Sequence, residues 1–168
     1  ITINIKLKKI TLKKVTLLDI KIIHNLFNEA VENNFFITKK KINFKEHKEW
    51  FLKNYKSLNT KILLCFLNNK KVGYIKFDII SPISAKVSIV LSKKFRKNKI
   101  GSEILSKGTK ICYKKFAIKS IYAEVLKKNK FSKYFFLKNG YKLINIKKKF
   151  KNEFNKKNLI FINKLKFN

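Results

Sequence analysis

A cluster of cationic side chains ends a short apolar run in the stretch KVSIVLSKKFRKNKIG, residues 86–101. Arg96, Lys97 and Lys99 precede Gly101, where a helix-like pattern begins. The first backbone N–H groups of a helix have no intrahelical partner, and the helix dipole is positive at that end. Phosphate fits such an end, and Gly101 has no Cβ to hold an anion away from the backbone. Two interpretations stay open: an anion site, and a solvated turn in a lysine-rich protein.

The formal net charge of the 168 residues is +33. Such a charge favours phosphate-rich partners, including nucleic acid, a membrane surface or a nucleotide ligand. The lysines are spread along the whole chain, however, whereas nucleic-acid-binding proteins more often gather them in a tail or on one face. We therefore interpret the charge as background composition and do not favour a nucleic-acid partner, although that alternative stays open.

Several other classes of protein are not indicated. No apolar run approaches the ~18–20 residues that span a bilayer, and the alternating N-terminal stretch ITINIKLKKITLKKV is typical of a strand and not of a signal peptide. Cys65 and Cys112 lie in apolar patterns without a CxxC motif, which predicts buried thiols in a cytoplasmic protein. The scattered His and Cys residues predict no metal site.

The elements that position the cationic junction follow from periodicity and capping signals. Thr16 and Asp19 resemble a helix start, and Asn43 with Glu46 resembles a second one. Strands are expected at 3–15, 61–67, 72–80, 85–91, 119–126, 141–150 and 158–167, and helices at 17–28, 43–55, 101–115 and 129–140. The order β-α-α-β-β-β-α-β-α-β-β predicts a mixed α/β protein, with residues 1–168 as one domain.

The segment RKNKIG resembles the pyrophosphate-binding segment of the GNAT acetyltransferases, whose pattern is Arg/Gln-x-x-Gly-x-Gly/Ala. Arg96 matches the first position and Gly101 the last, while Lys99 stands where the first glycine usually is. The stretch EVLKKNKFSKYFFLKNGYKLI resembles the strand-helix-strand unit that follows in that family, and the element order is similar too. The resemblance implies the GNAT fold, acetyl-CoA as the cofactor, and the activity of an N-acetyltransferase.

The resemblance also implies roles for particular residues. Acetyl-CoA would lie where the strand ending at Leu91 separates from the strand ending near Val125. In many members a tyrosine on the following helix protonates the leaving thiolate, but Phe136 occupies that position here and Tyr134 is expected to face elsewhere. The general acid is therefore left open. The residues implied in cofactor binding are Val90, Leu91, Arg96, Lys97, Asn98, Lys99, Ile100, Gly101, Ser102, Asn129 and Ser132.

The implied reaction needs a group that removes a proton from the attacking amine. The candidates are Glu46, His47, Glu49, Asp78 and Glu124, and we put forward Glu124, His47 and Glu46 as catalytic residues. Glu124 ends a strand at the expected cleft, although a carboxylate there could equally be paired with a lysine.

The acceptor site is sought in INFKEHKEWFLKN, residues 42–54, where His47 and Trp50 share a helix face. Trp50 and Phe51 are interpreted as substrate-binding walls; the alternative is that both are core residues and His47 lies on the surface. This segment resembles GNAT members that acetylate amino groups of nucleotide-linked sugars, as in pseudaminic acid synthesis, although Phe27 and Glu32 replace arginines common there.

The expected acceptor is therefore the primary amine of an anionic nucleotide sugar. Three alternatives stay open: a protein or peptide N-terminus (such as that of a ribosomal protein), a polyamine, and a nucleic-acid-binding protein that keeps the fold without catalysis. A chain at +33 should repel a polyamine. The oligomeric state is not predicted.

Overall fold

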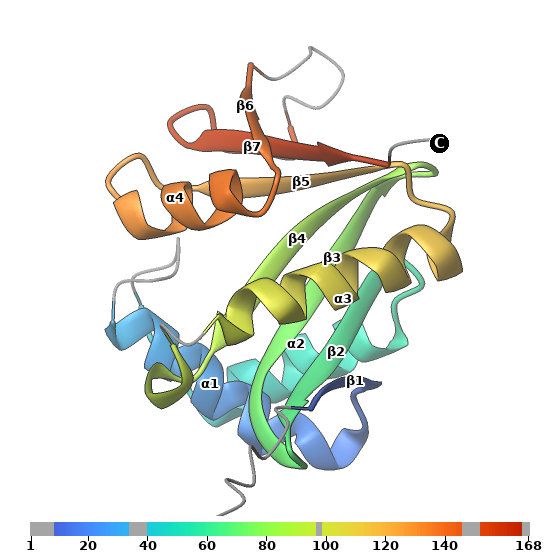
Figure 1. The fold of residues 1–168 in the computed structure, drawn as a ribbon. Coiled ribbons are helices and arrows are strands. Elements are labelled where there is room, and N and C mark those ends of the chain that lie inside the picture. Colours follow the sequence, from blue (N-terminus) through green and yellow to red (C-terminus); the bar gives the residue numbers. More distant parts are fainter. Residues whose placement is uncertain (1–8, 34–39, 97–98, 146–151, 166–168) are drawn as a thin grey trace, which may run out of the picture.

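The computed structural model describes residues 9–33, 40–96, 99–145 and 152–165. Within them, strands form one 7-stranded mixed sheet with the order β1-β2-β3-β4-β5-β7-β6 (Figure 1). The strands are β1 (Ile10–Lys14), β2 (Thr60–Leu67), β3 (Lys70–Ser81), β4 (Ser84–Leu91), β5 (Ser120–Val125), β6 (Lys142–Ile144) and β7 (Leu159–Lys164). The α-helices are α1 (Ile20–Glu32), α2 (Phe44–Lys56), α3 (Ile100–Phe116) and α4 (Lys130–Lys138), with short 3-10 turns at Leu17–Asp19 and Lys93–Phe95.

Local sequence signals account for where several elements begin and end. The Asp19 carboxylate accepts hydrogen bonds from the backbone and hydroxyl of Thr16, and the side chain of Asn43 accepts one from the Glu46 amide. Asn68 and Asn69, both at positive φ, form the turn between β2 and β3, a conformation that asparagine tolerates better than most residues. The observed order of helices and strands is the predicted one. Local signals such as these caps and this turn explain why the order could be predicted from the sequence.

Helices cover both faces of the sheet. Figure 1 shows α3 lying across one face of β2, β3 and β4, with α1 and α2 on the other. Buried residues including Ile75, Phe77 and Ile104 form the core under α3, whereas Ile23, Phe51 and others form the core under α1 and α2. Side chains alternate between these two cores along each central strand, as expected for a sheet buried on both faces.

The sheet opens between β4 and β5. These two strands are parallel, and their pairing covers four positions only, from Ser84↔Ser120 to Val87↔Ala123. Beyond Val87 the strands diverge, as the ribbons in Figure 1 show. Backbone groups of residues 88–91 that face the gap are not used in the β4–β5 ladder, so they can bind a ligand.

Some predicted boundaries differ from the observed ones. The first helix extends to Glu32, four residues beyond the expected end, and begins with a 3-10 turn. The strand expected at 141–150 is observed over Lys142–Ile144, and the first strand over Ile10–Lys14. Residues 3–8 and 146–150 of those two expected strands lie outside the described residues. In the part of the chain that the structure describes, no helix is long and apolar enough to cross a bilayer.

Candidate functional site

A cavity of about 410 Å³ occupies the gap between β4 and β5. Val87 and Ile89 line it from the α3 face of the sheet, whereas Ser88 and Val90, which alternate with them, line it from the α1–α2 face. The cavity thus reaches both faces of the sheet, so two ligands can approach the same gap from opposite sides. The full lining is Ala30, Val87, Ser88, Ile89, Val90, Leu91, Arg96, Lys99, Gly101, Ser102, Glu124, Val125, Leu126, Asn129, Phe131, Ser132, Tyr134, Phe135, Phe136 and Lys138.

The structure brings together most of the residues expected to bind the cofactor. The predicted residues in the lining are Val90, Leu91, Arg96, Lys99, Gly101, Ser102, Asn129 and Ser132. The side chain of Ile100 is 4% exposed and packs in the core, which leaves its backbone as the part able to contact a ligand. Lys97 and Asn98 lie outside the described residues.

Lys99 immediately precedes α3 and has φ +61°, in the left-handed region. L-residues other than glycine adopt this conformation at an energetic cost, because Cβ crowds the backbone. The backbone conformation therefore explains why the family pattern has glycine at this position. In this chain a cationic side chain occupies the strained position and faces the cavity.

Gly101 is the contact point between the beginning of α3 and helix α4. A Cβ at this position would lie 3.3 Å from Cε2 of Phe135, which is tighter than ordinary packing. One residue further on, the Ser102 hydroxyl accepts a hydrogen bond from the Asn139 side chain at 3.2 Å. These contacts hold the two helices on either side of the cavity in place.

Helix α4 supplies the second wall. The side chain of Asn129 caps this helix by accepting a hydrogen bond from the Ser132 amide at 2.9 Å, and both residues line the cavity. Tyr134 also lines the cavity, so the expectation that it faces elsewhere is wrong. Phe136 has no hydroxyl and packs in the core against Phe161, with a ring-centroid separation of 6.2 Å.

Glu124 is the one carboxylate among the described residues that line the cavity. Its Oε1 atom accepts hydrogen bonds from the Asn155 amide at 2.9 Å and the Asn158 side chain at 2.8 Å. Its Oε2 atom lies 3.6 Å from Nζ of Lys86. The alternative of a lysine-paired carboxylate is therefore observed, and the same carboxylate also faces the gap.

The other residues expected to be catalytic or substrate-binding do not line the cavity. Glu46 is exposed in the first turn of α2. His47 is 0% exposed, so the alternative that it lies on the surface is wrong; burial, and to a smaller extent the neighbouring His24, lower its pKa to about 4. Phe51 is also fully buried, and Trp50 packs against the same core beneath α1 and α2.

A row of polar side chains crosses the α1–α2 face of the sheet and ends at the gap. We call it the polar strip; its members are Lys76 and Asp78 on β3, Lys86 and Ser88 on β4, and Glu124 on β5. Asp78 and Lys86 are register neighbours, as are Lys76 and Ser88. Nζ of Lys76 lies 2.6 Å from the Asp78 carboxylate.

An aromatic ring lies beside each of the two lysines of the polar strip. Nζ of Lys76 lies 5.8 Å from the ring centroid of Trp50, and Nζ of Lys86 lies 5.3 Å from that of Phe154. Two cations and two carboxylates balance the charge of the strip. Charge-neutral rows of hydrogen-bonding groups beside aromatic rings can bind polar ligands that carry an apolar face.

Sequence reasoning missed Ser88 and the wall formed by Phe131, Tyr134 and Lys138. The three α4 residues are spaced as i, i+3 and i+7, a spacing that marks one helix face. That face is apolar in part and exposed in part, with Phe131 50% and Tyr134 65% exposed. The spacing could have identified the face, but only the packing of α4 against α3 shows that it borders a cavity.

Comparisons with known proteins agree with this geometry. Residues 9–142 match the family model described as "Acetyltransferase (GNAT) domain". No curated protein matches the chain. One similar solved structure is an acetyltransferase from Thermus thermophilus, with 16% identity, a TM-score of 0.76, and coverage of 94% of this chain and 97% of that one.

Two further similar structures have names that state an activity. The N-acetyltransferase PseH from Campylobacter jejuni, in complex with acetyl coenzyme A, is 18% identical with a TM-score of 0.71, covering 94% of this chain and 100% of that one. The ribosomal-protein alpha-N-acetyltransferase RimL, in complex with coenzyme A, is 16% identical with a TM-score of 0.75, covering 93% and 94%. The family match over most of the chain, with the GNAT fold, shows that this protein belongs to the GNAT acetyltransferase family and is an acyltransferase that uses acetyl-CoA.

Proposed function

We propose that the protein transfers the acetyl group of acetyl-CoA to the primary amine of a nucleotide-linked amino sugar. The observation that carries this proposal is the polar strip, which meets the cofactor cavity at Ser88 and Glu124 from the opposite face of the sheet. An acceptor lying along the strip would present its amine at the gap. We further propose that residues 1–168 form one domain and that it works in the cytoplasm, where the buried thiols of Cys65 and Cys112 would stay reduced.

The cavity fits the cofactor because its two ends have different chemistry. Around the gap, the unladdered backbone of residues 88–91 suits an amide-containing arm such as pantetheine. At the start of α3, Arg96 and Lys99 surround the helix N-terminus with positive charge, which suits a pyrophosphate. When bound, acetyl-CoA supplies a thioester carbonyl that an amine can attack.

Glu124 is the group we propose to receive the proton of the acceptor amine, directly or through water. It is the lining residue with the chemistry of a base, and it stands where the polar strip meets the gap. The Asn155 amide and the Asn158 side chain donate hydrogen bonds that fix the orientation of its carboxylate, and the Lys86 ammonium forms an ion pair with it at 3.6 Å. Only the deprotonated amine can attack the thioester carbonyl, so we expect the rate to rise with pH as the acceptor amine deprotonates.

The chemistry of the polar strip favours a sugar over the alternative acceptors. A polyamine needs net negative charge, whereas the charges of the strip are balanced within a strongly cationic protein. The hydroxyl groups of a sugar can exchange hydrogen bonds with lysines and carboxylates, while its apolar face stacks on Trp50. The resemblance of residues 42–54 to family members that act on nucleotide-linked sugars supports this acceptor, and the likeness to RimL, named as an alpha-N-protein acetyltransferase, supports a peptide N-terminus as the second choice.

The test is an acceptor panel with acetyl-CoA as donor, comparing UDP-linked amino sugars, free amino sugars, peptides and spermidine. Turnover of the nucleotide sugars is expected. Turnover of peptides alone would overturn the acceptor assignment, and tight salt-dependent nucleic-acid binding without acetyl-CoA binding would support the non-catalytic alternative.

A matched pair of variants tests the placement of the cofactor. Gly101→Glu and Gly101→Gln add side chains of similar size against Phe135, but only the first adds negative charge at the proposed pyrophosphate position. We expect G101E to bind acetyl-CoA at least about tenfold more weakly than G101Q, as measured by calorimetric titration. Equal affinity for the two variants would contradict the placement.

A further inference from the structure

Glu29 is an acidic residue in an electrostatically unfavourable position. It lies in the last turn of α1, where the helix dipole is negative and where this helix has no basic residue. A carboxylate there is destabilising by about 0.3–1 kcal/mol unless it is compensated. Local conflicts of this kind concentrate at functional sites, so the partners of Glu29 are informative.

The Glu29 carboxylate binds the segment that joins β4 to the cofactor cavity. Its Oε1 atom accepts a hydrogen bond from the Lys93 amide at 2.7 Å and faces the Ser92 hydroxyl at 3.4 Å. The same charge attracts the half-buried guanidinium of Arg96, which in turn donates from Nε to the Leu91 carbonyl at 2.8 Å. Glu29 therefore fixes the backbone immediately before the proposed pyrophosphate segment and attracts Arg96, the first cationic residue of that segment.

The residue before Glu29 in α1 contacts the segment that leads into helix α2. Asn28 exchanges two hydrogen bonds with the backbone of Ile42, at 2.9 and 3.1 Å, immediately before helix α2 begins. Helix α2 carries Trp50, which flanks the polar strip. Ala30, the next residue of α1, itself lines the cavity. One turn of α1 thus contacts the cofactor segment, the cofactor cavity and the chain that leads into α2.

We propose that Glu29 is a positioning residue that couples cofactor binding at Arg96 and at the start of α3 to the placement of α1 and α2 on the acceptor face. Binding of a polyphosphate at this segment would fix Arg96, and Glu29 would transmit that ordering to the end of α1. The hydrogen bonds between Asn28 and the Ile42 backbone would then order the start of α2 as well. The inference rests on the proposed pyrophosphate position, and it does not depend on the identity of the acceptor.

The experiment compares Glu29→Ala, Glu29→Gln and the control Glu32→Gln, using desulfo-CoA as the ligand. Glu32 lies on the same helix but pairs with Lys41 at the surface, away from the cofactor segment. We expect about tenfold weaker desulfo-CoA binding for E29A, a smaller loss for E29Q, which can still accept from the Lys93 amide, and no change for E32Q.

Hydrogen exchange of the ligand-saturated proteins distinguishes coupling from a merely structural role. In the wild type and in E32Q, desulfo-CoA should slow amide exchange in the last turns of α1 and in α2 as well as near the cavity. In E29A the slowing should stay confined to the cavity segments. Slowing of α1 and α2 in E29A equal to that in the wild type would overturn the coupling, and so would its absence in the wild type. Unweakened binding by G101E would instead show that the pyrophosphate position is wrong.

Discussion

At the scale of single residues, Lys99 shows how this chain departs from its family pattern. The position requires a left-handed backbone, which glycine adopts without strain. The lysine keeps that backbone at an energetic cost and places a cation on the cavity wall. Stability and ligand affinity are therefore expected to respond in opposite directions when this residue is changed.

Replacing Lys99 by glycine tests that opposition. We expect K99G to raise the free energy of unfolding by about 1 kcal/mol, because the left-handed backbone is no longer strained. The loss of the cation should weaken acetyl-CoA binding about three- to tenfold. Lys99→Gln is the control, since it removes the charge and keeps the strain. Denaturant unfolding and calorimetric titration measure the two effects; a K99G protein less stable than the wild type would contradict the strain argument.

The second residue-scale prediction concerns His47. Its folded-state pKa of about 4 lies below the ordinary value of 6.5, because burial disfavours the charged imidazolium. Between these values the unfolded chain binds a proton that the folded protein does not, so stability falls as pH falls through this window. We expect this residue to account for a loss of about 2 to 3 kcal/mol between pH 7 and pH 4.5.

Urea unfolding of the wild type and of His47→Phe at both pH values isolates this contribution, since the carboxylates titrate alike in the two proteins. The variant should lose less stability on acidification. An identical loss in both proteins would show that His47 is not the group responsible.

At the scale of elements, capping side chains determine the residues at which helices α2 and α4 begin. Asn129 begins α4 beside the gap, whereas Asn43 begins α2 on the other face of the sheet. Each side chain accepts one hydrogen bond of 2.9 Å from the first turn of its helix. The two caps therefore have the same local geometry, but only the helix that Asn129 caps lies beside the cavity.

Removing each cap separates stability from ligand binding. Asn43→Ala and Asn129→Ala should each lower the free energy of unfolding by about 1 kcal/mol. Only N129A should also weaken acetyl-CoA binding, because Asn129 and Ser132 line the cavity. Thermal unfolding and titration of both variants would check this, and equal affinities would mean that the start of α4 does not contribute to the site.

The elements themselves were largely predictable, because their signals are local: caps at Asn43 and Asn129, a two-asparagine turn, and alternating strands. Non-local packing was not predictable. The donors that hold Glu124 come from Asn155 and Asn158, more than thirty positions away in the chain. The burial of His47 depends on α1, and the role of Tyr134 as a cavity wall depends on how α4 packs against α3.

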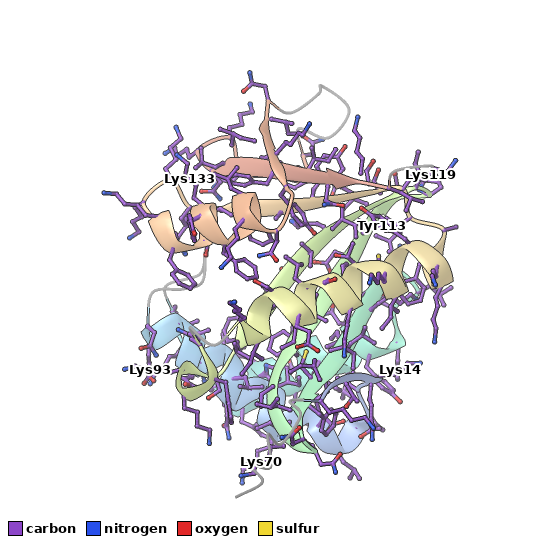
Figure 2. All side chains as sticks on the ribbon, in the orientation of Figure 1. Lys14, Lys70, Lys93, Tyr113, Lys119 and Lys133 are labelled. Carbon is purple, nitrogen blue, oxygen red and sulfur yellow. The ribbon has the colours of Figure 1, made fainter. Side chains whose placement is uncertain are left out.

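At the scale of the whole molecule, the positive charge is distributed and not concentrated. Figure 2 shows Lys14, Lys70, Lys93, Lys119 and Lys133 at widely separated points of the surface. Such a field attracts any anionic ligand from many directions, but it does not mark one binding face. The sequence could therefore predict an affinity for anions, while the polar strip became recognisable only when three strands placed its members side by side.

The strand order has a consequence for how the protein is synthesised. Every described wall of the cavity lies within residues 30–138, yet the outer edge of β5 is covered by β7, at Leu159–Lys164. While a ribosome is still adding the residues between these two strands, the nascent chain holds all of its cavity-lining segments and an open strand edge beside them. Because β5 carries the lining residues Glu124 and Val125 and pairs with β7, this wall is expected to be held in place only after β7 has joined the sheet, and until then the open edge of β5 is exposed to a chaperone or to a neighbouring copy.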